Sequence, residues 1–178
     1  LQSGRLAYLL PRPVSYLGST FSEALGTLFA NLLVLGTVTF LFTLWQTGSL
    51  PFQGTAFIIA LIFGIFAGIL AVIFQMLIGL SAFWLQDVTP FFWVFEKLLF
   101  MFGGLMLPLS IYPNWLQTLA NFTPFPAILG ERSALALNFN SQAVLNLSIS
   151  LIGWSLIGFI ALSLVYRRGL RILNIEGG

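Results

Sequence analysis

Long apolar segments, separated by short polar or proline-containing stretches, make up most of the chain. Each segment is continuously apolar over about 20 residues, the length of a helix that crosses a bilayer, whereas the strands of a membrane barrel alternate over about 10 residues. The pattern therefore predicts an all-α integral membrane protein with four transmembrane helices, at residues 22–45, 55–85, 91–107 and 143–166.

The arginines outside these segments predict how the chain is oriented. Arg5 and Arg12 precede the first segment, and Arg167, Arg168 and Arg171 follow the last one, in a tail of residues 167–178. Cytoplasmic loops carry an excess of Lys and Arg, so both ends of the chain are expected on the cytoplasmic side. This requires an even number of crossings, which four helices provide.

Residues 108–142 remain apolar but do not have the sequence of one regular helix. They contain four prolines and an adjacent pair of charges, namely Pro108, Pro113, Pro124, Pro126, Glu131 and Arg132. A fifth crossing here would put the two arginine clusters on opposite sides of the membrane. We therefore predict an external re-entrant hairpin, which dips into the membrane from the outer face and returns. Non-helical backbone at membrane depth is tolerated only where protein or a water-filled cavity covers it, so this hairpin indicates a transporter.

Residues 1–20 are predicted to form a short interfacial segment. Leu6, Leu9 and Leu10 fall on one face of a helix that Pro11 would end. The arginines in the same stretch favour the cytoplasmic interface, where the segment would set the topology, contact anionic lipid or contact a partner. The sequence begins at Leu1 rather than Met, and we expect that an N-terminal part of the protein precedes it.

The composition supports membrane insertion. Of the 178 residues, 58% are hydrophobic and 7% are charged, and no Lys, Arg, Asp or Glu occurs between Glu23 and Asp87. An average soluble domain has roughly 25% charged residues. The net charge of +2 provides no basic stripe, so nucleic acid is not an expected partner.

Several catalytic groups are missing from the sequence. It contains no Cys and no His, which removes disulfides, thiolate metal sites and the commonest general base. Lys97 is the only lysine and follows Glu96 rather than a glycine-rich phosphate-binding loop, while Asp87 is the only aspartate, so an aspartyl dyad cannot form. We expect neither a metal site nor catalysis in this chain.

Four polar residues in the predicted helices are candidates for function. Ionisable groups at membrane depth usually have a functional role, but a position at the lipid headgroups would also explain Glu96 and Lys97. As sequence neighbours these two point in different directions on a helix, so they are not expected to pair with each other. Asn31 and Gln75 suit either a substrate path or a hydrogen bond between helices.

Glu131 and Arg132 are expected in the external hairpin. One interpretation is that they gate the exit of a path or pair with a second subunit. The other is a solvated turn with polar residues at its tip. The sequence does not distinguish between the two.

Three motifs resemble one family of membrane proteins. They are "SGRLAYLLPRPVSYL" near the start, "FMFGGLMLPLSIYPNWLQTLANFTPF" in the middle and "YRRGLRIL" after the last apolar segment. In this order they resemble the coupling segment, the fifth helix with its re-entrant hairpin, and the sixth helix with its tail, in the type-2 permeases of bacterial ATP-binding-cassette (ABC) exporters. The resemblance covers nearly the whole chain, but only the last four of that family's six helices.

The resemblance implies roles for two groups of residues. The first group would contact a cytoplasmic ATPase and consists of Arg5, Leu6, Tyr8, Leu9 and Arg12. The second group would form the re-entrant hairpin and consists of Gly103, Gly104, Pro108, Pro113, Pro124, Pro126, Glu131 and Arg132. Asn31, Gln75 and Glu96 would then line the path or link helices.

The resemblance also implies partners and a location. The chain would be a permease subunit in the bacterial inner membrane, paired with a second permease subunit and with an ATPase that holds ATP and magnesium. This chain itself would bind no cofactor. The cargo is not identified, although aromatic richness fits a lipophilic compound. Two alternatives to an exporter are a membrane-embedded scaffold without transport and a passive channel.

Overall fold

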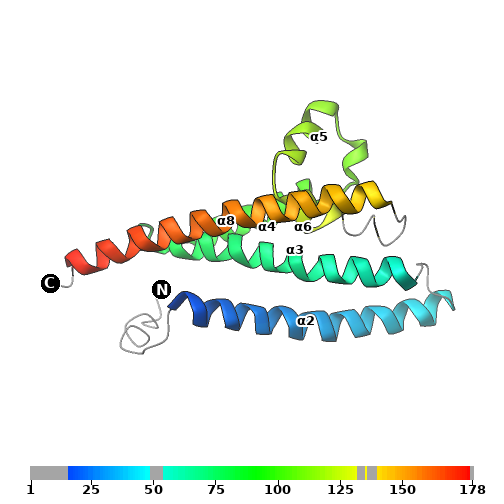
Figure 1. Cartoon of the computed structure of the whole chain (residues 1–178), viewed down its shortest axis with the longest axis horizontal. Coiled ribbons are helices and arrows are strands. Elements are labelled where there is room, and N and C mark those ends of the chain that lie inside the picture. Colours follow the sequence, from blue (N-terminus) through cyan, green and yellow to red (C-terminus); the bar gives the residue numbers. More distant parts are fainter. Residues whose placement is uncertain (1–15, 49–53, 132–134, 136–139, 177–178) are drawn as a thin grey trace. The chain divides into compact units, whose positions relative to one another are not determined.

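The computed structural model describes residues 16–48, 54–131, 135 and 140–176. Every secondary-structure element in these ranges is a helix (Figure 1). The chain divides into two compact units, residues 1–50 and residues 51–178. The first unit contains α2 (Tyr16–Thr47), and the second contains all the other elements.

The helix α2 is long, apolar and free of proline. Its threonine hydroxyls donate to the backbone carbonyl four residues earlier, as Thr27 does to Glu23 at 3.0 Å and Thr43 does to Thr39 at 2.9 Å. Such bonds satisfy the hydroxyls within the helix, which matters where no water is present. The predicted span at 22–45 lies entirely within α2, and residues 16–20, expected in the interfacial segment, also belong to this helix.

Two long helices, α3 (Gly54–Leu80) and α8 (Ser141–Glu176), pack against each other in the second unit (Figure 1). Glycines of α8 permit the contact. A Cβ atom on Gly158 would lie 2.8 Å from the Ile73 side chain, and one on Gly169 would collide with the Phe83 ring. Because both contacts join residues in the same order along the chain, the two helices run in parallel.

The helix α4 (Thr89–Phe102) follows a turn at Asp87 and ends at a glycine cap. The Asp87 carboxylate accepts a hydrogen bond from the Thr89 N–H at 2.9 Å. This bond lowers the pKa of the Asp87 carboxyl. At the other end Gly104 has a positive φ of 75°, and the Leu105 N–H donates to the Phe100 carbonyl at 3.1 Å, which is the Schellman motif that ends many helices. The helix therefore ends at Phe102, five residues before the predicted end of the third span.

Prolines of the hairpin begin its short helices instead of interrupting one long helix. Pro108 precedes η2 (Leu109–Ile111), Pro113 precedes α5 (Asn114–Asn121), and Pro124 precedes α6 (Phe125–Ile128). Proline suits these positions because the first N–H groups of a helix have no partner within it. Where the sequence suggested irregular backbone, the structure has three consecutive helical pieces.

Three described helices are long and apolar enough to cross a membrane, at Leu17–Thr47, Thr55–Phe83 and Ser141–Arg171. They coincide with the first, second and fourth predicted spans. The last one continues as a helix to Glu176, beyond the arginines that were expected to end it. The all-helical class is confirmed for the described residues, while α4 is too short to be counted with these three, so the layout with four crossings stays a prediction.

Candidate functional site: the α6 insertion and the neighbouring polar layer

The short helix α6 is enclosed by three longer helices. All four of its residues are buried, and it contacts α3, α4 and α8. Ala127 packs in one buried cluster with Ala67 of α3 and Leu151 of α8. At 1.5 Å per residue, Ala67 lies about 20 Å from the start of α3 at Gly54. The hairpin therefore returns to the middle of a helix long enough to span the membrane.

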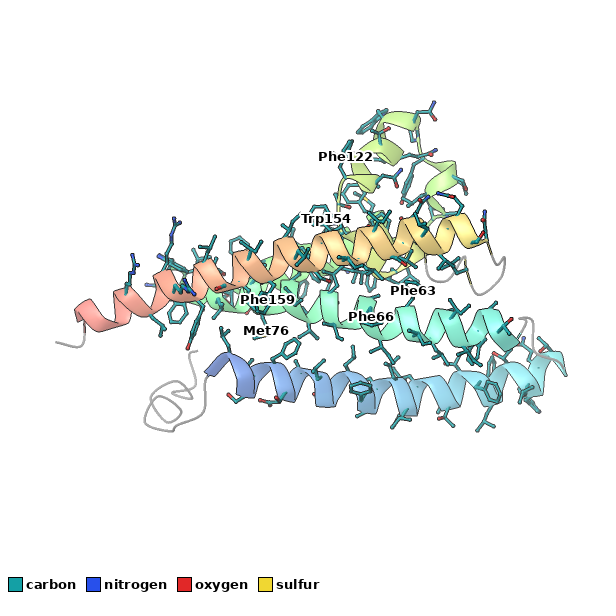
Figure 2. All side chains as sticks on the ribbon, viewed as in Figure 1. Phe63, Phe66, Met76, Phe122, Trp154 and Phe159 are labelled. Atoms are coloured by element: carbon teal, nitrogen blue, oxygen red, sulfur yellow. The ribbon has the colours of Figure 1, made fainter. Side chains whose placement is uncertain are left out.

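Aromatic rings attach α6 to its neighbours. The Phe125 ring centroid lies 5.7 Å from that of Phe95 and 6.2 Å from that of Phe102, both on α4. Phe95 in turn stacks on Phe74 of α3 at 6.4 Å, and Phe74 contacts Trp154 of α8, which is labelled in Figure 2, at the same distance. Aromatic pairs at such spacings are each worth about 0.5–1.5 kcal/mol beyond the area they bury.

Two glycines meet where the hairpin leaves α4 and where it returns. A Cβ atom on Gly103 would lie 2.9 Å from the Cβ of Leu129, and one on Gly130 would lie 2.7 Å from the Gly103 carbonyl oxygen. Both distances are shorter than real Cβ contacts allow. Glycine at these two positions therefore lets the backbones approach closely enough for α6 to fit between the long helices.

The part of the hairpin around α5 is held by hydrogen bonds from side chains to the backbone. The Tyr112 hydroxyl donates to the Met101 carbonyl at 3.2 Å, and the Gln117 side-chain amide donates to the Tyr112 carbonyl at 2.7 Å. One face of α5 is apolar and exposed, and Phe122, which follows the helix, is 76% exposed (Figure 2). The helix α5 lies to one side of the pair formed by α3 and α8 (Figure 1).

Glu131 follows the glycine contact directly. Its side chain is partly buried, and the loss of hydration raises the pKa of the carboxyl above its ordinary value. Both interpretations of Glu131, as a gating or pairing residue and as part of a solvated turn, stay predictions. Arg132, its expected neighbour in that role, lies outside the described residues.

A polar layer, which we define as Gln75, Glu96 and Lys97, lies beside the aromatic cluster. Gln75 directly follows Phe74 on α3, and Glu96 directly follows Phe95 on α4, so each lies one residue from the stacked ring pair. All three side chains are exposed on this chain. The Lys97 ammonium lies 5.8 Å from the centroid of the Phe100 ring, a cation–π distance.

Comparison with known families identifies the family of this chain. The sequence model described as "ABC-2 family transporter protein" matches residues 1–177. The chain belongs to the ABC-2 transporter family. No curated protein and no solved structure is significantly similar to it. Membership in this family makes the chain a membrane transport subunit of an ABC transporter, and it implies a partner ATPase.

Within this family, the structure brings together only part of the predicted site. Gly103, Gly104 and the four prolines all lie in the hairpin and its caps. The residues predicted to contact the ATPase, which are Arg5, Leu6, Tyr8, Leu9 and Arg12, lie outside the described residues. Asn31 is exposed on α2, in the other unit, so its relation to Gln75 and Glu96 stays a prediction.

Sequence reasoning missed two residues of the hairpin. Gly130 was not singled out, although a glycine between apolar residues and a charged pair suggests a close backbone approach. Phe125 was not recognised either, because it is one of 19 phenylalanines and nothing in the sequence distinguishes the one at the centre of a cluster.

Proposed function

We propose that this ABC-2 family protein is the permease subunit of a bacterial exporter, and that it carries a lipophilic or amphipathic compound across the inner membrane. The family match over residues 1–177 is the observation that supports this most directly. The enclosed helix α6 adds support, because a segment that returns to the middle of a long apolar helix is a feature of transport proteins.

In this proposal the chain supplies the passage and a partner supplies the energy. Two permease subunits enclose the path, and two cytoplasmic ATPases bind ATP and magnesium. Closure of the ATPases pushes the segment that contains Arg5, Leu6, Tyr8, Leu9 and Arg12. The push switches the path from inward-open to outward-open. α4 reaches from the cytoplasmic side to the level of α6, so it connects that movement to the hairpin.

The first test is co-purification. The full-length protein, extracted from its native membranes in mild detergent, should bring down a soluble ATPase with a phosphate-binding loop. Recovery of membrane proteins alone, even when ATP hydrolysis is blocked to trap the complex, would count against the exporter and favour a membrane scaffold.

The second test separates coupling from assembly. The triple variant Arg5→Glu, Leu6→Ala, Leu9→Ala should remain in the membrane but should no longer link ATP hydrolysis to export. A control, Leu170→Ala with Arg171→Glu, makes the same kinds of change near the end of α8 and should leave export unchanged. Export at the normal rate by the triple variant would refute the coupling role.

A further inference from the structure

We infer that one face of α4 binds a lipophilic organic cation, so that the cargo is an apolar compound with a positively charged group. We call it the Glu96 face and define it as Phe92, Trp93, Glu96 and Phe100. The inference rests on the proposed function, because it treats the compound bound there as the cargo. It goes further because it assigns that cargo a charge and names the residues that recognise it.

The Glu96 face consists of one carboxylate among three aromatic side chains. The aromatic residues lie four residues before, three residues before and four residues after the carboxylate, at Phe92, Trp93 and Phe100. Residues at these intervals share one side of a helix. Glu96 is exposed, Trp93 is 66% exposed, and the two phenylalanines are partly exposed. The described protein therefore leaves the carboxylate and the indole ring accessible to a ligand.

The Glu96 carboxylate forms no ion pair with a cation among the described residues. Its neighbour Lys97 points to a different side of the helix, and the Lys97 ammonium lies instead 5.8 Å from the centroid of the Phe100 ring. The other described cations are arginines near the C-terminal end of α8. Within the described chain, the negative charge of Glu96 is therefore uncompensated, and it suits a cation that comes from outside.

The depth of Glu96 follows from the packing of α4 on α3. The apolar range Thr55–Phe83 has its midpoint at Ile69. Phe95, next to Glu96, stacks on Phe74, which lies five residues or about 8 Å along α3 from that midpoint. The hydrocarbon layer extends about 15 Å on each side of its centre. With α3 across the membrane, Glu96 is therefore at a depth where an ionisable group usually marks a substrate or ion pathway.

The residues of this face favour an organic cation over a metal ion. Calcium and magnesium ions take about six or more oxygen ligands, and Glu96 is the only residue of the face with a side-chain oxygen. Aromatic rings instead attract ammonium groups, including those whose charge is surrounded by carbon. The Lys97 ammonium, at cation–π distance from Phe100, is an example of this attraction within the face itself. A carboxylate among aromatic rings therefore fits a cation with apolar substituents.

Two probes of similar shape and opposite charge test the inference. Tetraphenylphosphonium is a lipophilic cation, and tetraphenylborate is a lipophilic anion of nearly the same size. The full-length protein in nanodiscs should bind the cation at least about tenfold more tightly than the anion, because Glu96 attracts one charge and repels the other. Empty nanodiscs, measured alongside, give the partition of each probe into lipid, which is subtracted.

Variants of the face locate the binding. Glu96→Gln keeps the size of the side chain and removes its charge, so it should raise the dissociation constant of tetraphenylphosphonium at least about tenfold and abolish the preference for the cation. Trp93→Leu should raise this constant about two- to thirtyfold, the range expected of a cation–π contact, whereas Trp93→Phe should retain most of the affinity. Asp87→Asn removes an acid outside the face and should leave the binding of both probes unchanged.

Equal dissociation constants for the two probes in the parent, or an unchanged constant for the cation in Glu96→Gln, would overturn the inference. The comparison of probes in the parent decides the question even where a variant does not reach the membrane. Co-purification of the ATPase is measured on the same samples. If the ATPase is recovered while the parent has no preference for the cation, only the charge of the cargo is wrong. If the cation is preferred but no ATPase is recovered, the exporter is wrong and the binding face stands.

Discussion

The contact between Gly103 and Gly130 makes a sharp prediction about how the hairpin is held. In Gly130→Ala the new Cβ would lie 2.7 Å from the Gly103 carbonyl oxygen, which belongs to the backbone and cannot rotate away. Over-packing of this kind costs about 1–3 kcal/mol. Replacement of a helical glycine by alanine also gains about 0.5–1 kcal/mol, which partly offsets the collision.

A matched variant allows the gain from replacing a helical glycine by alanine to be subtracted. Gly153→Ala places a Cβ on α8 where no atom lies within 4 Å, so it has the same helical gain without the collision. The difference in free energy of unfolding between the two variants should therefore equal the collision, about 1–3 kcal/mol. Since 1 kcal/mol corresponds to about 2–4 °C for a chain of this size, Gly130→Ala should melt about 2–12 °C below Gly153→Ala in detergent.

A second measurement shows whether the lost stability comes from α6. The sequence has no cysteine, so Ala127→Cys introduces a single thiol at a fully buried position on α6. This thiol should resist a maleimide reagent in the parent and with Gly153→Ala, and should react when Gly130→Ala is added. Equal melting temperatures for the two alanine variants, together with a thiol that stays protected in both, would refute the tight glycine contact.

Three further predictions concern other parts of the second unit. Gly169→Val should destabilise the protein by about 1–3 kcal/mol through collision with the Phe83 ring. In a double-mutant cycle of unfolding free energies, the added change Phe83→Ala should recover part of this loss. Cysteines introduced at Asn114 and Asn140 should both react with an impermeant reagent from outside, since a re-entrant hairpin begins and ends on one face; reaction from opposite sides would make the segment a crossing. The pKa of the Glu131 carboxyl is raised by burial, so the folded state binds the proton more tightly than the unfolded state. Stability should therefore be greatest below the ordinary glutamate pKa of about 4.3 and should fall as the pH rises through the raised value, and Glu131→Gln should flatten this part of the melting profile.

The long helices could be predicted from the sequence because several features of each segment indicate the same helix. Twenty or more apolar residues without a proline leave few alternatives to a spanning helix, and α2, α3 and α8 agree with the prediction in place and type. The end of α4 was missed although its signal was present. Gly103 and Gly104 form the kind of glycine cap that ends a helix, but the apolar residues up to Leu107 suggested that the span continued.

The prolines of the hairpin show a different limit of sequence reasoning. Proline both interrupts a helix and begins one, and the two roles differ only in which residues precede it. At Pro113 and Pro124 the chain arrives in a turn, so the missing N–H costs nothing and a short helix follows. A single sequence does not show where the preceding helix has already ended, so the expected irregular backbone and the observed helices were not distinguishable.

The enclosure of α6 decides between two explanations for an apolar segment that is not one regular helix. Such a segment at membrane depth is covered either by protein or by a water-filled path. All four α6 residues are buried among α3, α4 and α8, so protein covers them and no path runs through this position. The exposed polar layer at Gln75, Glu96 and Lys97 then becomes the part of this unit best suited to face a partner or a passage. The short helix α6 is therefore a packed support for α4 within this unit, and the passage that we propose would have to lie elsewhere on the chain.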